Sequence, residues 1–170
     1  MSYVKVLDFC ESVTGYAVFD AATTNLAATT SSWFGTNAIE FDKAAGTSVT
    51  CGAGKTLTGS QVIKVGHFVN PHDYIGWELY VTATTNIAHA FVRIGRNATN
   101  YLEFRYADSS IGTNVWTRCN SRLGDAYITG TGCDWDKITY IAIGVVFDST
   151  ANTLADMWVD HVYLTSATLA

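Results

Sequence analysis

Residues 74–82 read YIGWELYVT, and large apolar side chains alternate with other types along this stretch. The residues of one parity are Ile75, Trp77, Leu79 and Val81. The other parity holds Gly76, Glu78 and Tyr80. Successive side chains of a β-strand point to opposite faces, so the pattern predicts a strand with one face buried.

The same pattern recurs along most of the chain. It is strong at 37–43, 61–69, 87–95, 99–107, 137–147 and 156–164, and weaker at 3–7, 15–19, 47–50 and 115–119. Short runs of Gly, Asn, Asp and Ser separate these stretches, and no segment has a helical period. Residues 21–33 are rich in Ala and Thr and are interpreted as a loop. We expect an all-β fold, a two-sheet antiparallel β-sandwich of the jelly-roll type, as one domain spanning residues 1–170.

Composition narrows the classes of function. Charged residues make up 15% of the 170 residues, against about 25% in a typical domain. The net charge is −5 and no run of Lys or Arg occurs, so we expect no nucleic-acid partner. The start, MSYVKVLDF, lacks the pattern of a secretory signal, and the apolar run at 138–147 is half the length of a membrane-spanning helix. We therefore expect synthesis in a cytosol without a signal peptide, and no membrane association.

Residues 51–58 read CGAGKTLT, which resembles the end of a phosphate-binding loop. That loop requires a glycine five residues before Gly54, and Val49 stands there. The following residues are β-branched and lack a helical period, whereas the loop should lead into a helix. We interpret the stretch as a glycine-rich turn between strands.

The sequence contains no complete catalytic motif among those considered below. One family of sandwich glycosidases carries its carboxylates on one strand as E-x-D-x-x-E, because a period of two points them at the same sugar. Glu40 and Asp42 supply the first two acids, but Ala45 stands in place of the second glutamate. With no general acid and no G-x-S-x-G nucleophile motif, we expect no enzymatic activity.

The four cysteines, Cys10, Cys51, Cys119 and Cys133, do not have zinc-site spacing. In a cytosol they are expected to be free and buried. A Cys119–Cys133 disulfide is the alternative if the mature protein functions outside a cell.

Aromatic residues are the remaining candidates for binding. Tyr80 and Tyr101 fall on the second face of alternating strands, and Trp116 lies near a turn. Such rings can stack on a sugar or on a protein partner. We take Tyr80, Tyr101 and Trp116 as the candidate ligand-binding residues.

Three stretches carry a resemblance to known families. The opening LDFCESVTGYAVFDAATTNLAATTSSWFGTNAIEFDK (7–43) and the ending MWVDHVYLTS (157–166) resemble jelly-roll modules of the galactose-binding and carbohydrate-binding type. The middle, FVRIGRNATNYLEFRYADSSIGTNVW (91–116), is similar to the version of this module in structural proteins of tailed-phage virions. The sequence departs from carbohydrate-binding modules in having Tyr16 where a tryptophan often stands.

The resemblance implies a non-enzymatic virion protein, first of all a decoration protein on the capsid exterior. Its partner would be the major capsid protein or a neighbouring virion protein, and it would often be a homotrimer. A surface with few charges suits such packing, because little charge is desolvated. The alternative that the resemblance implies is a glycan-binding adhesion module.

The resemblance also implies a structural calcium ion. In such modules the first acidic segment and the aspartate of the last strand often bind it, and the matching positions are Asp8, Glu11 and Asp160. Calcium takes six to eight oxygen ligands and would relieve the repulsion between carboxylates from the two chain ends.

Overall fold

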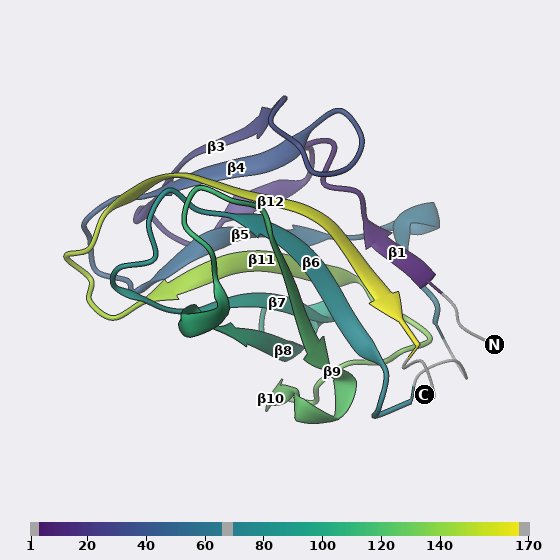
Figure 1. The fold of residues 1–170 in the computed structure, drawn as a ribbon. Coiled ribbons are helices and arrows are strands. Elements are labelled where there is room, and N and C mark those ends of the chain that lie inside the picture. The colour runs from purple at the N-terminus through teal and green to yellow at the C-terminus, as the bar shows by residue number, and fades with distance from the viewer. Residues whose placement is uncertain (1–3, 66–69, 167–170) are drawn as a thin grey trace.

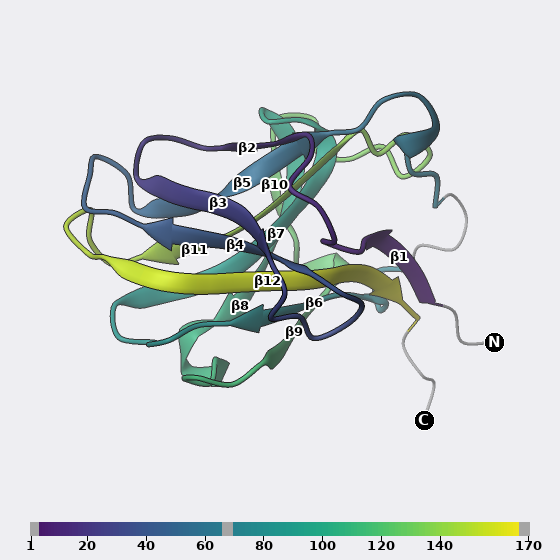
Figure 2. The same cartoon turned by 90° about the horizontal axis from the view of Figure 1, so that it is seen from above.

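Two antiparallel β-sheets stack face to face in the computed structural model, which describes residues 4–65 and 70–166 (Figures 1 and 2). Sheet A has the order β3-β4-β12-β6-β9, with β1 also paired to β12, and sheet B has the order β10-β8-β7-β11-β5-β2. The strands of sheet A are β1 (Val4–Asp8), β3 (Thr23–Thr29), β4 (Ala38–Lys43), β6 (Tyr74–Tyr80), β9 (Thr117–Arg122) and β12 (Leu154–Thr165). Those of sheet B are β2 (Tyr16–Val18), β5 (Thr50–Thr56), β7 (Ile87–Asn97), β8 (Asn100–Ala107), β10 (Tyr127–Thr129) and β11 (Tyr140–Phe147). The predicted all-β sandwich is confirmed.

The core lies between the two sheets and consists of every second residue of each strand, the apolar ones of the alternation. On β6, Ile75, Trp77 and Leu79 are at most 1% exposed. Burying side chains of this size contributes about 1.5–3 kcal/mol each, which makes the alternation the main determinant of the fold. The other parity of every strand is left for the outer face of its sheet.

Strand β12 organises sheet A. Its first half pairs with β4 and its last residues pair with β1, while β6 runs along its other side. The register with β6 shifts between Asp160 and Tyr163, and His161 has a φ of 50°. This bulge inserts an extra residue, so Asp160, His161 and Tyr163 all lie away from the core.

Two sequence interpretations were wrong. Residues 21–33 are not all loop, because Thr23–Thr29 form the edge strand β3, paired with β4. The stretch 51–58 is not a turn, because Thr50–Thr56 form β5, hydrogen-bonded between β11 and β2. Lys55 lies within β5, and its amine is 2.7 Å from the carboxylate of Asp8.

Strand β10 was not predicted from the sequence. The predicted strand at 61–69 is described only to residue 65, where Ile63 forms an isolated bridge with Ile138; residues 66–69 lie outside the described part. Among the described helices, none is long and apolar enough to cross a membrane.

Candidate functional site

The outer face of sheet B carries a layer of planar side chains around Arg93. The guanidinium carbon of Arg93 lies 4.2 Å from the ring centroid of Phe91, 4.8 Å from that of Tyr101 and 5.3 Å from that of Phe19. Such distances are those of cation–π contacts. Together with Tyr140 on β11, we call these residues the Arg93 layer: Phe19, Phe91, Arg93, Tyr101 and Tyr140.

Glycines allow the rings of this layer to lie close to the sheet. A Cβ atom on Gly54 would approach Tyr140 Cζ to 2.9 Å, and one on Gly144 would approach Phe91 Cζ to 2.7 Å. Real Cβ atoms do not come so close to other heavy atoms, so a larger residue would displace these rings. Gly54, which suggested a phosphate loop in the sequence, therefore provides room for the ring of Tyr140, as Gly144 does for that of Phe91.

A carboxylate holds Arg93 in place. Glu103 Oε2 lies 2.7 Å from an Nη atom of Arg93, and Glu103 Oε1 lies 2.5 Å from Arg105 Nε. Burial by itself would raise the pKa of Glu103, but the hydrogen bonds from Arg105 and Arg93 outweigh it and the pKa is lowered. Glu103 is thus ionised at neutral pH although only 5% of it is exposed.

The residues of the Arg93 layer come from several strands of sheet B. Phe19 follows β2 at the edge, Tyr140 is on β11, Arg93 is on β7 and Tyr101 is on β8. Their side chains nevertheless converge, because the ring centroids of Phe19, Phe91 and Tyr101 all lie within 5.3 Å of the guanidinium carbon of Arg93. Phe91 is fully buried and Tyr140 is 6% exposed, so Phe19, Arg93 and Tyr101 are the members of the layer that a ligand can reach. They offer ring surface beside fixed donors, which is the chemistry that a polyhydroxylated ligand requires.

A second aromatic group lies on the outer face of sheet A. The rings of Tyr80 and Trp158 are stacked with centroids 4.2 Å apart, and Trp116 lies 5.9 Å from Tyr80. Trp158 and Tyr80 face each other in the register of β12 and β6. All three residues are half-buried.

The three predicted ligand-binding residues are thus divided between opposite faces. Tyr80 and Trp116 are together on sheet A, and Tyr101 is on sheet B. The outward orientation expected for Tyr80 and Tyr101 is found, but one small ligand cannot contact all three. Arg93 was missed, because a single arginine in a strand pattern gives no binding signal.

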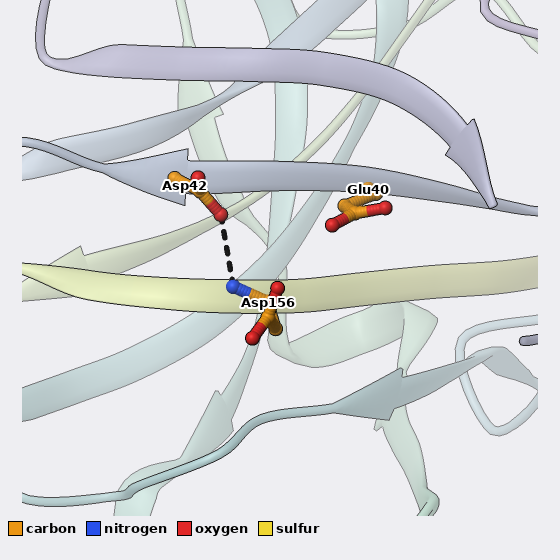
Figure 3. A group of neighbouring side chains, drawn as sticks. All are labelled: Glu40, Asp42 and Asp156. Atoms are coloured by element: carbon orange, nitrogen blue, oxygen red, sulfur yellow. Dashed lines mark hydrogen bonds between the residues drawn. The ribbon is translucent and has the colours of Figure 1, made fainter.

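Glu40, Asp42 and Asp156 form an acidic group on sheet A (Figure 3). Each offers an oxygen within 4.8 Å of the others, and within the described ranges this is the one such group of three metal-ligating side chains. Asp42 also accepts a hydrogen bond from the backbone nitrogen of Asp156 at 2.8 Å. Burial first, and then the carboxylates of Asp156 and Asp42, raise the pKa of Glu40. The sequence could not indicate Asp156 as their neighbour, because 114 residues separate it from Asp42.

The residues expected to bind calcium have other partners. Asp8 forms the ion pair with Lys55 and accepts a hydrogen bond from the backbone nitrogen of Cys10. Glu11 accepts bonds from the backbone nitrogens of Thr36 and Asn37, and these bonds, that of Thr36 foremost, lower its pKa. Neither carboxylate needs a metal ion to be compensated.

Asp160 has one bound and one unbound oxygen. Its Oδ2 atom accepts hydrogen bonds from the backbone nitrogens of Trp33 and Phe34 at 2.9 and 2.7 Å. Its Oδ1 atom is buried without a hydrogen-bond partner among the described residues. Asp160 Oδ1 therefore has the free lone pairs that a cation would need. Asp8, however, is already neutralised by Lys55, so the three residues fit a calcium site only in part. Calcium binding stays a prediction.

The four cysteines are free, so the alternative Cys119–Cys133 disulfide is not formed. Cys10, Cys51 and Cys119 are buried as expected, while Cys133 is half-buried. Burial raises the pKa of Cys51 and of Cys133 to about 12. The thiols are therefore poor nucleophiles.

The fold is that of β-sandwich carbohydrate-binding modules. A family 11 carbohydrate-binding module of a cellulosomal cellulase from Clostridium thermocellum superposes with a TM-score of 0.63 at 14% identity, covering 97% of this chain and 95% of that one. A family 30 module of another cellulosomal cellulase from the same organism gives a TM-score of 0.62 at 13% identity, with 98% and 99% covered.

A further structure of the family 11 module, in complex with a β-1,3-1,4-mixed-linked tetrasaccharide, gives a TM-score of 0.59 at 14% identity and covers 95% of this chain and 94% of that one. At such identities the likeness establishes the fold alone. No protein-family model and no curated protein sequence matches this chain.

Proposed function

We propose that this protein is a carbohydrate-binding module and that a glycan chain lies on the outer face of sheet B. The observation that carries the proposal is the Arg93 layer, in which rings from several strands surround a fixed guanidinium. The likeness of the fold to modules that are named for carbohydrate binding supports it.

The layer suits a polyhydroxylated ligand of low charge. Sugar rings present C–H faces that pack on aromatic rings, and hydroxyl groups that need donors and acceptors at fixed positions. Arg93 supplies donors and the Tyr101 hydroxyl can donate or accept, and the ion pair with Glu103 holds Arg93 in place before the ligand arrives. This pre-organisation lowers the entropy lost on binding.

Capsid decoration, which the sequence resemblance placed first, has no support from the structures compared above. They favour the alternative, glycan binding. These neighbours are binding modules, and the proposal accordingly assigns no catalytic step to this chain.

Affinity electrophoresis through gels containing neutral polysaccharides, mixed-linkage β-1,3-1,4-glucan among them, tests the proposal. We expect retardation by at least one polysaccharide, and its loss in the Tyr101→Ala and Arg93→Lys variants. The lysine keeps the charge but lacks the planar group that stacks and bonds in two directions. The matched control is Ile128→Ala, an exposed apolar residue on β10 outside the layer.

Two results would overturn the proposal. One is the absence of retardation in every polysaccharide for a folded protein. The other is retardation that Tyr101→Ala leaves intact and Tyr80→Ala abolishes, since this would move the site to sheet A.

A further inference from the structure

The outer face of sheet A contains a cavity of about 690 Å³ that the proposed function does not use. Its walls come from β6, β9 and β12 and from residues 30–37, which connect β3 to β4 and which we call the 30–37 loop. This volume lies within the range of about 300–1,000 Å³ that is typical of small-molecule sites. The cavity lies on the face of the sandwich opposite the Arg93 layer.

Aromatic rings form one wall of the cavity. Phe34 and His161 are stacked with centroids 4.7 Å apart at an interplanar angle of 16°, and Tyr163 follows at 4.9 Å from His161. Tyr163 lies across Gly76, where a Cβ atom would come within 2.6 Å of its Cζ. Phe34 is 51% exposed, so a large part of its ring is open to a ligand.

The wall is held in place before any ligand binds. Asp160 accepts the hydrogen bonds from the backbone nitrogens of Trp33 and Phe34, and Glu11 accepts those from Thr36 and Asn37. Two carboxylates on other segments therefore fix both halves of the 30–37 loop. Hydrogen bonds to ionised acceptors are about twice as strong as neutral ones, which makes this an effective anchor.

Polar groups line the rest of the cavity. Glu78 is 2% exposed and its Oε1 atom accepts a hydrogen bond from Arg118 Nε at 2.9 Å. No hydrogen bond joins the Nη atoms of Arg118 to another residue of the described chain, and the side chain is 62% exposed. Asn120 adds an amide on the next outward position of β9. The cavity thus offers donors from Arg118 and Asn120 beside an aromatic wall.

The local charge bears on the kind of ligand. Glu78 forms an ion pair with Arg118, and burial, as the first cause, raises the pKa of Glu78 and that of the adjacent Asp160. Burial, as the first cause, lowers the pKa of His161, so that ring is neutral at pH 7. The ion pair leaves no excess positive charge to attract an anion, and the donors and rings favour a neutral hydroxylated ring.

From this geometry we infer a second ligand site on sheet A, which binds one neutral sugar residue at a chain end or a free neutral saccharide. The ring packs on Phe34 and Tyr163, and its hydroxyl groups bond to Arg118 and Asn120. The site goes beyond the proposed function, because it lies on the opposite face and shares no residue with the Arg93 layer.

Chemical-shift mapping by NMR tests the inference with glucose, galactose, mannose, xylose and their disaccharides, and with glucuronate as the anionic comparison. We expect at least one neutral saccharide at millimolar concentration to shift the amide signals of Trp33, Phe34 and His161. Phe34→Ala should weaken that binding about tenfold, as removal of a central aromatic contact does. Ile128→Ala is the control, and glucuronate should bind more weakly than glucose.

The outcomes separate the two sites. Shifts confined to the Arg93 layer would leave the proposed function standing and overturn this inference. Saccharide-induced changes of amide signals at the cavity that persist in Arg93→Lys and disappear in Phe34→Ala would support the second site. They would do so even if no polysaccharide retarded the protein in the gel experiment. Saturable binding that Phe34→Ala and Tyr163→Ala both leave unchanged, or tighter binding of glucuronate, would overturn it.

Discussion

The Oδ2 atom of Asp160 lies 2.7 Å from the backbone nitrogen of Phe34, although 126 residues separate them in sequence. Asp160 is fully buried on β12, and the same oxygen also accepts a bond from Trp33. An aspartate of the last strand therefore positions a loop from the first third of the chain. The 30–37 loop carries two exposed aromatic rings, Trp33 and Phe34, and owes its place to this contact.

We expect Asp160→Ala to lower the free energy of unfolding by about 1.5–3 kcal/mol, because hydrogen bonds to an ionised acceptor are lost. The loss should occur in chelator as well as in calcium, since the loop anchor needs no metal ion. Urea unfolding in both buffers measures it, with the exposed Asp148→Ala as control. An Asp160→Ala variant as stable as wild type in chelator would contradict the anchoring role.

The calcium prediction is tested by the same series. If Asp8, Glu11 and Asp160 share an ion, a hundredfold excess over the dissociation constant stabilises wild type by about 2.7 kcal/mol. For this size of domain, that raises the melting temperature by roughly 5–11 °C. Asp160→Ala should lack this increase. Wild-type melting curves that coincide in millimolar calcium and in chelator would refute calcium binding.

Gly54→Ala should destabilise the protein by about 1–3 kcal/mol, because the new methyl group collides with the ring of Tyr140. The three heavy atoms nearest to a Cβ atom on Gly54 all belong to Tyr140. The double variant Gly54→Ala/Tyr140→Ser should therefore relieve the collision. A double-mutant cycle of unfolding free energies measures the coupling. Strict additivity of the two substitutions would show that Tyr140 does not lie over Gly54.

Glu103→Gln should lower the free energy of unfolding at pH 7 by about 1–3 kcal/mol. This is less than for a fully buried ion pair, because the Arg105 side chain is 40% exposed. The pKa of Glu103 is lowered in the folded state, so its ionised form stabilises the protein above the unfolded pKa of about 4.3. That contribution disappears as the pH falls through the folded pKa.

The difference between wild type and Glu103→Gln should therefore be constant from pH 7 to about pH 5 and shrink at lower pH. Urea unfolding at a series of pH values checks this. A difference that grows towards low pH would have the wrong sign for an acid with a lowered pKa.

The thiols should be unreactive in the native protein. Burial raises the pKa values of Cys51 and Cys133 to about 12, so little thiolate exists at pH 8. We expect slow alkylation of the native protein, rapid alkylation of four thiols in denaturant, and no effect of reductant on the melting temperature. Fewer than four reactive thiols in denaturant without reductant would indicate a disulfide.

The sequence predicted those strands that bury one face and expose the other. Strands β6 and β8 alternate in the sequence as they do in the structure, because burial between the two sheets requires every second side chain to be apolar. Strand β3 was missed, since it is an edge strand of Thr, Asn and Ala in which Leu26 is the one large apolar residue. Strand β5 was read as a turn, since its glycines are covered by rings from other strands.

For the candidate sites, the sequence by itself identified outward aromatic residues such as Tyr80 and Tyr101, and acidic residues such as Asp160. Only the tertiary structure decided which of them are neighbours. Strand pairing placed Tyr80 on sheet A and Tyr101 on sheet B, and it brought Asp160 under the 30–37 loop. The physical reason is that alternation is a local property of each strand, whereas the order of strands in a sheet follows from packing between segments that are distant in the chain.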